Sequence, residues 1–225
     1  MRVAILESIV MPAGHEVEFD RIMVEELKKQ GHEPVFFVPE HFPFKLDYHC
    51  DVEYLDGGEV VTYAGAGKLK KIFLSLIRER RRVAWFNSAY DKACAHHCDA
   101  IIIPTGTWRY IRTILHSKLK ASPVPVYIIF HGINPHEQPK FEKQARKVES
   151  YQNIHLKVIT LRDDFKNSGL HNIDLIVPPV FKPWELPVNK SLSFKPPIKI
   201  GFFGQFRNEK NLGFFLEAFT KASFT

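Results

Sequence analysis

Short apolar runs recur along this chain, separated by longer stretches in which apolar residues follow helical spacing. The runs cover residues 2–6, 34–38, 100–103, 124–130, 155–160 and 174–177. Runs this short and this apolar are typical of strands buried on both faces of a parallel sheet. The first two enclose a helical segment, 16–30, which Gly31 is expected to end in the left-handed conformation. We therefore predict an α/β fold with a Rossmann-like parallel sheet and helices on both faces.

Two stretches interrupt this pattern. Residues 36–63 are rich in Pro, His, Asp and Gly, which predicts a loop excursion with at most short strands, at the rim of a functional site. Prolines cluster near residues 178–197, and proline stiffens a chain and removes hydrogen-bond donors. We expect a Rossmann-like domain over 1–180, a Pro-rich interdomain linker over 181–197 and the incomplete start of a second Rossmann-like domain over 198–225.

The net charge and the cysteines indicate the kind of partner and the cellular compartment. A formal net charge of +6 predicts an anionic partner. A nucleic-acid partner is not expected, because aromatic and basic residues do not interleave on any predicted strand pair. The chain has three cysteines and begins without a signal-peptide pattern, which favours the reducing cytoplasm. No apolar run approaches the roughly 18 residues that cross a bilayer.

A basic amphipathic segment covers residues 68–82. Seven of these fifteen residues are Lys or Arg and one is Glu, while Leu69, Ile72, Phe73, Leu76 and Ile77 form an apolar stripe at helical spacing. Two interpretations stay open. The stripe from Lys68 to Arg82 lies on an anionic membrane surface, or it packs on the sheet and leaves its charges in water.

A glycine turn between a predicted strand, 198–203, and a predicted helix, 209–222, carries Arg207 and Lys210. Backbone amides, a helix N-terminus and two cations converge there, so an anion is the expected ligand. A capped turn with solvated cations is the alternative.

This segment, 201–211, resembles the opening of the nucleotide-sugar domain of GT-B glycosyltransferases of the family-4 type. Gly14-His15 and the run 27–34 look like the first βαβ unit of the same family, in the expected order. The resemblance implies transfer of a sugar from a nucleotide-diphosphate donor to a hydroxyl of a saccharide or lipid-linked acceptor. It also implies retention of anomeric configuration, a role in cell-surface polysaccharide or glycolipid synthesis, and no metal or other cofactor.

The resemblance also assigns residues to the donor diphosphate. Glycines let the backbone approach the diphosphate closely, and the basic pair neutralises the charge of the diphosphate. The assigned positions are Gly14, Gly204, Arg207, Lys210 and Asn211. One departure stands out. The family commonly places arginine directly after the glycine, where this chain has Gln205.

On the acceptor side, the resemblance implies a histidine at the reaction centre, and His131 fits because it follows the predicted strand 124–130. Ligands of open α/β sheets bind beyond the carboxyl ends of the strands. A histidine satisfied by loop carbonyls is the alternative. Further acceptor-side candidates are His15, Thr105, Gly106 and Gly132, and the hydroxyl of Thr105 and the amide of Gly106 are expected to meet an acceptor hydroxyl.

Two other patterns are interpreted as structural. The family's paired glutamates lie late in its second domain, so the similarly spaced pairs Glu18 with Glu26 and Glu25 with Glu33 are taken as surface charges. Cys94 and Cys98 share a helix face, but a structural zinc site needs four ligands and the other candidates, His49 and Cys50, are distant in the sequence, so no metal is expected. The rival to an enzyme is a non-catalytic, truncated acceptor-binding module that needs a missing second half or a partner chain. An enzyme of this kind is expected in the cytoplasm, peripheral on the inner face of the plasma membrane.

Overall fold

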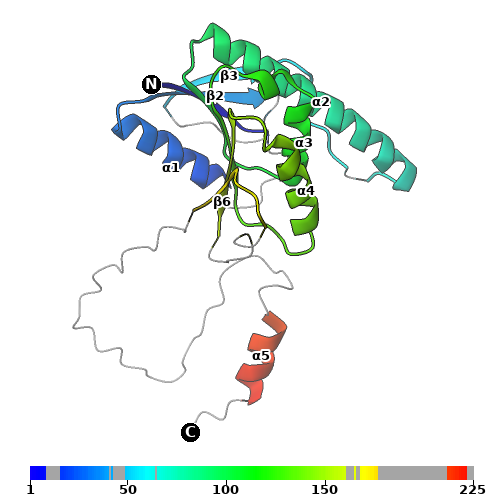
Figure 1. Cartoon of the computed structure of the whole chain (residues 1–225). Coiled ribbons are helices and arrows are strands. Elements are labelled where there is room, and N and C mark those ends of the chain that lie inside the picture. The colour runs from blue at the N-terminus through cyan, green and yellow to red at the C-terminus, as the bar shows by residue number, and fades with distance from the viewer. Residues whose placement is uncertain are drawn as a thin grey trace, which may run out of the picture. The chain divides into compact units, whose positions relative to one another are not determined.

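The computed structural model describes residues 1–8, 16–40, 42, 49–63, 65–160, 165, 168–176 and 212–221 (Figure 1). The chain divides into two compact units, Met1–Pro179 and Val180–Thr225. The strands of the first unit are β1 (Arg2–Leu6), β2 (Glu33–Pro39), β3 (Asp51–Leu55), β4 (Ala100–Ile103), β5 (Val126–Phe130), β6 (Ile154–Ile159) and β7 (Ile173–Ile176). Its helices are α1 (Glu16–Lys29), α2 (Lys68–Ala95), α3 (Trp108–Leu115), the 3-10 turn Lys118–Ala121 and α4 (Gln138–Val148).

The seven strands form one sheet in the order β3-β2-β1-β4-β5-β6-β7, and every neighbouring pair is parallel. Val3 of β1 pairs with Pro34 of β2 on one side and with Ala100 of β4 on the other. The predicted fold class, a Rossmann-like parallel sheet with helices on both faces, is therefore confirmed. The strand order reverses between β1 and β4, which fixes where a ligand crevice forms.

Helix α1 covers one face of the sheet, and α2, α3 and α4 cover the other (Figure 1). The α1 face has a small core in which Val24 packs with Ile5, Phe36 and Val38. A larger core, containing Trp85 of α2, lies on the other face. Strand β1 contributes to both cores, which explains why its sequence is continuously apolar.

Strands β5 and β6 differ from the expectation of burial on both faces, because buried and half-buried residues alternate along them. The half-buried positions include Tyr127, which stacks on His155 with ring centroids 4.8 Å apart. The neighbouring Lys157 binds Asp174 of β7. This face of the two strands is therefore closed by amphipathic side chains, whose apolar parts pack while their polar ends reach water.

The excursion predicted over 36–63 contains a regular strand. Strand β3 pairs in parallel with β2, with Val35 opposite Asp51 and Pro39 opposite Leu55. Only Leu55 of β3 is buried. A short strand agrees with the expectation for this stretch. Its position was not predicted, because a strand at the edge of a sheet with polar side chains lacks the apolar run that marks the central strands.

Helix α1 matches its predicted boundaries closely and ends as expected. Gly31 has φ +78°; its amide donates to the carbonyl of Lys28 at 2.9 Å, and the amide of His32 donates to the carbonyl of Leu27 at 2.9 Å, as in a Schellman C-terminal cap. The glutamates Glu18, Glu25, Glu26 and Glu33 are exposed. Glu18 and Glu25 both bind Arg21, so the interpretation of these residues as surface charges is confirmed.

Helix α2 has two unlike halves. Its second half packs on the sheet through Trp85, Phe86 and Ala89, which are buried. Its first half projects beyond α3 (Figure 1), and the exposed fractions of Leu69, Ile72, Phe73 and Leu76 are 85%, 62%, 64% and 61%. The alternative in which this stripe packs on the sheet is therefore wrong for these four residues.

The described part of the second unit is helix α5 (Leu212–Lys221), where Lys221 binds Glu217 one turn earlier. The predicted linker, 181–197, and the predicted strand and glycine turn that follow it lie outside the described residues. Among the described residues, no helix combines the length and the apolar character that spanning a bilayer requires.

Candidate functional site

The strand order reverses between β1 and β4, so the carboxyl ends of β1, β4 and β5 mark the edge of the sheet at which a ligand-binding crevice is expected. Ser8 follows β1, the segment Pro104 to Thr107 follows β4, and His131 follows β5. In open α/β sheets, ligands bind in the crevice beyond these strand ends, because loops leave the sheet there in opposite directions. The structure thus brings together the predicted residues Thr105, Gly106 and His131.

His131 is held in place from two sides. Its Nε2 lies 2.9 Å from the carbonyl oxygen of Pro104, and the ring of Phe19 meets the imidazole edge-on with centroids 4.5 Å apart. A carbonyl oxygen only accepts, so Nε2 carries the proton, and in the neutral form of the ring Nδ1 is the acceptor atom. Gly132 follows with φ +83°, a conformation that lets the chain turn away directly after the histidine. The contact with a loop carbonyl, which the alternative interpretation of this histidine predicts, is thus present in the structure.

Gly106 has a structural reason to be glycine. A Cβ at this position would stand 2.5 Å from Cγ2 of Ile128 and 3.0 Å from the carbonyl oxygen of Ile129. The Gly106 amide donates to that same carbonyl at 2.7 Å. The expectation that this amide meets an acceptor hydroxyl is therefore corrected, because β5 already uses the donor. The hydroxyl oxygen of the neighbouring Thr105 is buried and has no hydrogen-bond partner among the described residues.

A polar network extends from the crevice toward α2 and α3. The hydroxyl of Ser8 donates to the hydroxyl of Tyr110 at 3.0 Å, and the guanidinium of Arg82 lies 4.9 Å from the centre of the Tyr110 ring. Arg82 and Arg112 each bind a carboxylate oxygen of Glu79 at 2.8 Å. Burial raises the pKa of Tyr110, so its hydroxyl stays protonated and neutral. The network fixes the end of β1 against two helices.

Two buried carboxyl groups stand at the beginning of α1. Asp20 is 1% exposed and Glu16 is 9% exposed. Burial, and after it the charge of Glu16, raise the pKa of Asp20 to about 8. Asp20 is therefore mostly protonated at pH 7, and this end of α1 carries less negative charge toward the crevice than its sequence indicates. Perturbed groups of this kind gather at functional sites, although they also occur in structural cores.

The residues Ser8, Tyr110, Arg82 and Asp20 were missed by sequence reasoning. Ser8 carried a weak signal, since a polar residue directly after a buried strand lies at the ligand-binding edge of the sheet. The others lie inside helices, where one polar residue on an apolar face has no distinctive pattern.

Several predicted site residues lie outside the described residues. These are Gly14 and His15 in the first loop, and Gly204, Arg207, Lys210 and Asn211 in the second unit. Their assignments remain predictions. Within the part of the chain that the structure describes, no group of three or more His, Cys, Asp and Glu side chains is placed to hold a metal ion. Cys94 is exposed and Cys98 is buried, and both are free thiols.

No protein-family model matches the sequence, and no curated protein matches it. Solved structures similar to the chain include CalG4, the calicheamicin glycosyltransferase, with 16% identity and a TM-score of 0.43, covering 60% of this chain and 34% of that one. The glycosyltransferase SnogD from Streptomyces nogalater shows 14% identity and a TM-score of 0.43, with 71% and 46% covered.

A third similar structure, the glycotransferase of kitacinnamycin, has 9% identity and a TM-score of 0.47, and 79% of this chain and 51% of that one are covered. The chain thus spans between about a third and a half of the length of these proteins. The fold class itself rests on the seven-stranded parallel sheet.

Proposed function

We propose that this chain belongs to a glycosyltransferase of GT-B architecture that moves a sugar from a nucleotide-diphosphate donor to an acceptor hydroxyl. The observation that carries the proposal is the position of His131, which follows β5 at the crevice and is held there by the Pro104 carbonyl. The motifs around Gly14 and in 201–211, which resemble the family-4 type, agree with it. The first unit would bind the acceptor, and the second would begin the donor site.

His131 is the proposed group at the reaction centre. A neutral imidazole with its proton on Nε2 accepts at Nδ1, and such an atom receives a hydrogen bond from a hydroxyl nucleophile. The carbonyl of Pro104 supports this role because it fixes the tautomer and the ring orientation. The Thr105 hydroxyl, buried and without a partner among the described residues, is a further candidate for contact with the acceptor.

The donor side of the proposal concerns the diphosphate. Gly14 and Gly204 would allow close approach of the backbone, and Arg207, Lys210 and Asn211 would supply donors. Charge-assisted hydrogen bonds from cations, together with helix N-terminal amides, stabilise the departing diphosphate without a metal ion. Further parts of the proposal are retention of configuration, a saccharide or lipid-linked acceptor, cell-surface polysaccharide or glycolipid synthesis, and a cytoplasmic site of action.

Sugar release from UDP- and GDP-linked sugars by the purified 225-residue chain tests the proposal. Turnover supports the enzyme. Binding of the nucleotides without turnover supports the rival, a non-catalytic acceptor-binding module that needs a second half from elsewhere. The absence of both binding and turnover at millimolar nucleotide sugar would contradict the proposed function.

A further inference from the structure

The first part of α2, residues 68–77, is a projecting tip with an apolar side that the first unit does not cover. Leu69, Ile72, Phe73 and Leu76 keep between 61% and 85% of their surface exposed. Four large apolar side chains on neighbouring turns of one helix form a continuous patch. They therefore differ from the single apolar residues that are scattered over most protein surfaces. Exposure of this kind indicates a surface that meets an apolar phase or a partner.

The charge around the tip has one sign. Lys68, Lys70 and Lys71 are exposed, and residues 68–78 contain no Asp or Glu. The next acidic residue, Glu79, is occupied by Arg82 and Arg112. A second copy of this chain would bring the same positive charges against these lysines, which disfavours self-association through the tip. The complementary partner is apolar and anionic.

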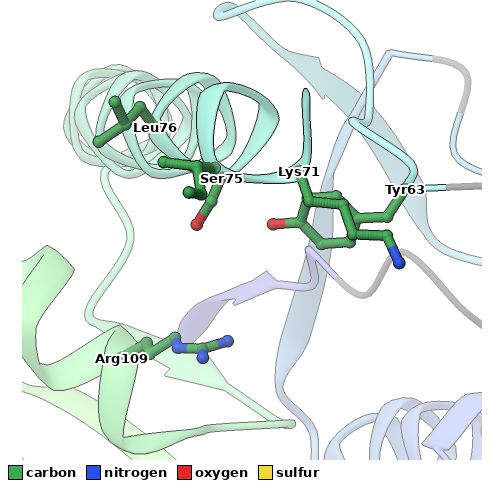
Figure 2. A pocket seen from close by; sticks show the side chains of 6 residues that line it. Tyr63, Lys71, Ser75, Leu76 and Arg109 are labelled. Atoms are coloured by element: carbon green, nitrogen blue, oxygen red, sulfur yellow. The ribbon is translucent and has the colours of Figure 1, made fainter. Parts of the chain in front are cut away.

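A pocket of about 480 Å³ opens at the base of the tip, between α2 and the beginning of α3. It is lined by Tyr63, Lys71, Ile72, Ser75, Leu76 and Arg109. Figure 2 shows the hydroxyl of Ser75 and the guanidinium of Arg109 pointing into the space between the two helices. Cationic and hydroxyl donors thus share one wall with aliphatic side chains.

Cationic side chains lie close to Tyr63 in the pocket wall. The Arg78 guanidinium lies 5.4 Å from the centre of the Tyr63 ring, and Lys71, Ser75 and Arg109 line the pocket together with Tyr63. Burial raises the pKa of Tyr63, but the hydrogen bonds from Arg78 and Ser75 and the charges of Arg78 and Arg109 outweigh it, so the net pKa lies below the usual value. Lys71 and Arg109 line the pocket and residues 68–78 contain no Asp or Glu, so the local potential is positive, which favours a bound anion.

We propose that this pocket receives the phosphate-bearing headgroup of an anionic phospholipid while the apolar tip enters the membrane surface. Lys71, Arg109 and the two hydroxyls would contact the headgroup phosphate, and Ile72 and Leu76 would lie beside the start of the acyl chains. Leu69 and Phe73 would insert at the boundary between headgroups and acyl chains, as amphipathic interfacial helices do. The inference concerns membrane docking alone and does not depend on sugar transfer.

Sedimentation of the full chain with vesicles tests the proposal, with phosphatidylcholine alone compared with phosphatidylcholine containing phosphatidylglycerol. Binding is expected only to the anionic vesicles. The double variant K71Q/R109Q should reduce the partition coefficient about tenfold or more, because basic groups near an anionic surface each contribute to binding. The variant K143Q/K147Q is the matched control: it removes the same charge from exposed positions on α4 and should bind nearly as well as the wild type.

Two further variants separate a headgroup pocket from diffuse attraction. Y63F/S75A leaves the charge unchanged and should still weaken binding several-fold, because it removes two hydroxyls from the pocket. L69S/F73S should weaken binding about tenfold and leave the fold intact, since both side chains are exposed. Equal binding by K71Q/R109Q and K143Q/K147Q, an unchanged affinity of Y63F/S75A, or no binding of the wild type to anionic vesicles would overturn the proposal. The vesicle assay contains no sugar nucleotide, so a lack of membrane binding leaves the proposed sugar transfer untouched.

Discussion

Nε2 of His131 lies 2.9 Å from the carbonyl oxygen of Pro104, and this contact joins the loops that follow β5 and β4. The two loops flank the crevice where the strand order reverses, so the contact sets both the position and the tautomer of the histidine. The proposed chemistry depends on this geometry.

Replacing His131 by alanine should reduce sugar transfer by a factor of about 10² to 10⁴, the usual contribution of a positioned acid–base group. The rate of sugar release from the donor is the measurement. His116→Ala is the control, because His116 is exposed at the end of α3 and should keep the wild-type rate. Equal rates for H131A and H116A would remove His131 from the reaction centre.

Replacing Arg207 and Lys210 together by alanine should lower kcat/KM for the donor by one to several powers of ten, because charge-assisted contacts to the diphosphate are lost. Steady-state kinetics with a UDP- or GDP-linked sugar gives the comparison. K143A/K147A removes the same charge from α4 and should have the kcat/KM of the wild type. If R207A/K210A also has the kcat/KM of the wild type, the diphosphate binds elsewhere.

Replacing Gly106 by alanine should destabilise the first unit by about 1 to 3 kcal/mol, since the new Cβ would press on Ile128 and on the backbone of β5. Urea denaturation followed by circular dichroism measures the change. Gly213→Ala is the matched control, because a Cβ there has no atom within 4 Å. If the urea midpoint of G106A equals that of the wild type, the loop accommodates the added Cβ without a loss of stability.

The raised pKa of Asp20 makes stability depend on pH in a definite direction. Between the ordinary value of 3.8 and the folded value of about 8, the folded state binds a proton that the unfolded state has lost. The free energy of unfolding therefore falls as pH rises through this window, by at most about 1.4 kcal/mol per pH unit for this one group. D20N should remove this part of the pH dependence of the unfolding free energy. It should stabilise the protein most at the high-pH end of the window.

Urea denaturation of wild type and D20N at pH 5 and pH 8 checks this expectation, with the exposed Asp91→Asn as a control for the chemical change. A wild-type slope that D20N leaves intact would show that Asp20 ionises normally in the folded protein.

The central strands and α1 could be predicted from the sequence because burial on both faces and one apolar helix stripe leave clear patterns. Strand β3 could not, since an edge strand with Asp51 and an exposed Tyr54 lacks such a pattern. His131 was found through its place after a strand. The contacts between Ser8 and Tyr110 and between Gly106 and β5 join residues distant in the sequence, and no local spacing encodes them.

Titration calorimetry of the 225-residue chain with UDP and GDP, compared with UMP and GMP, tests the central claim most directly. The second phosphate adds charge-assisted hydrogen bonds, so the diphosphates should bind about tenfold or more tightly than the monophosphates, with dissociation constants in the millimolar range or below. Absence of diphosphate binding at millimolar concentration, or equal affinities for diphosphates and monophosphates, would contradict the assignment of this chain to a nucleotide-sugar glycosyltransferase.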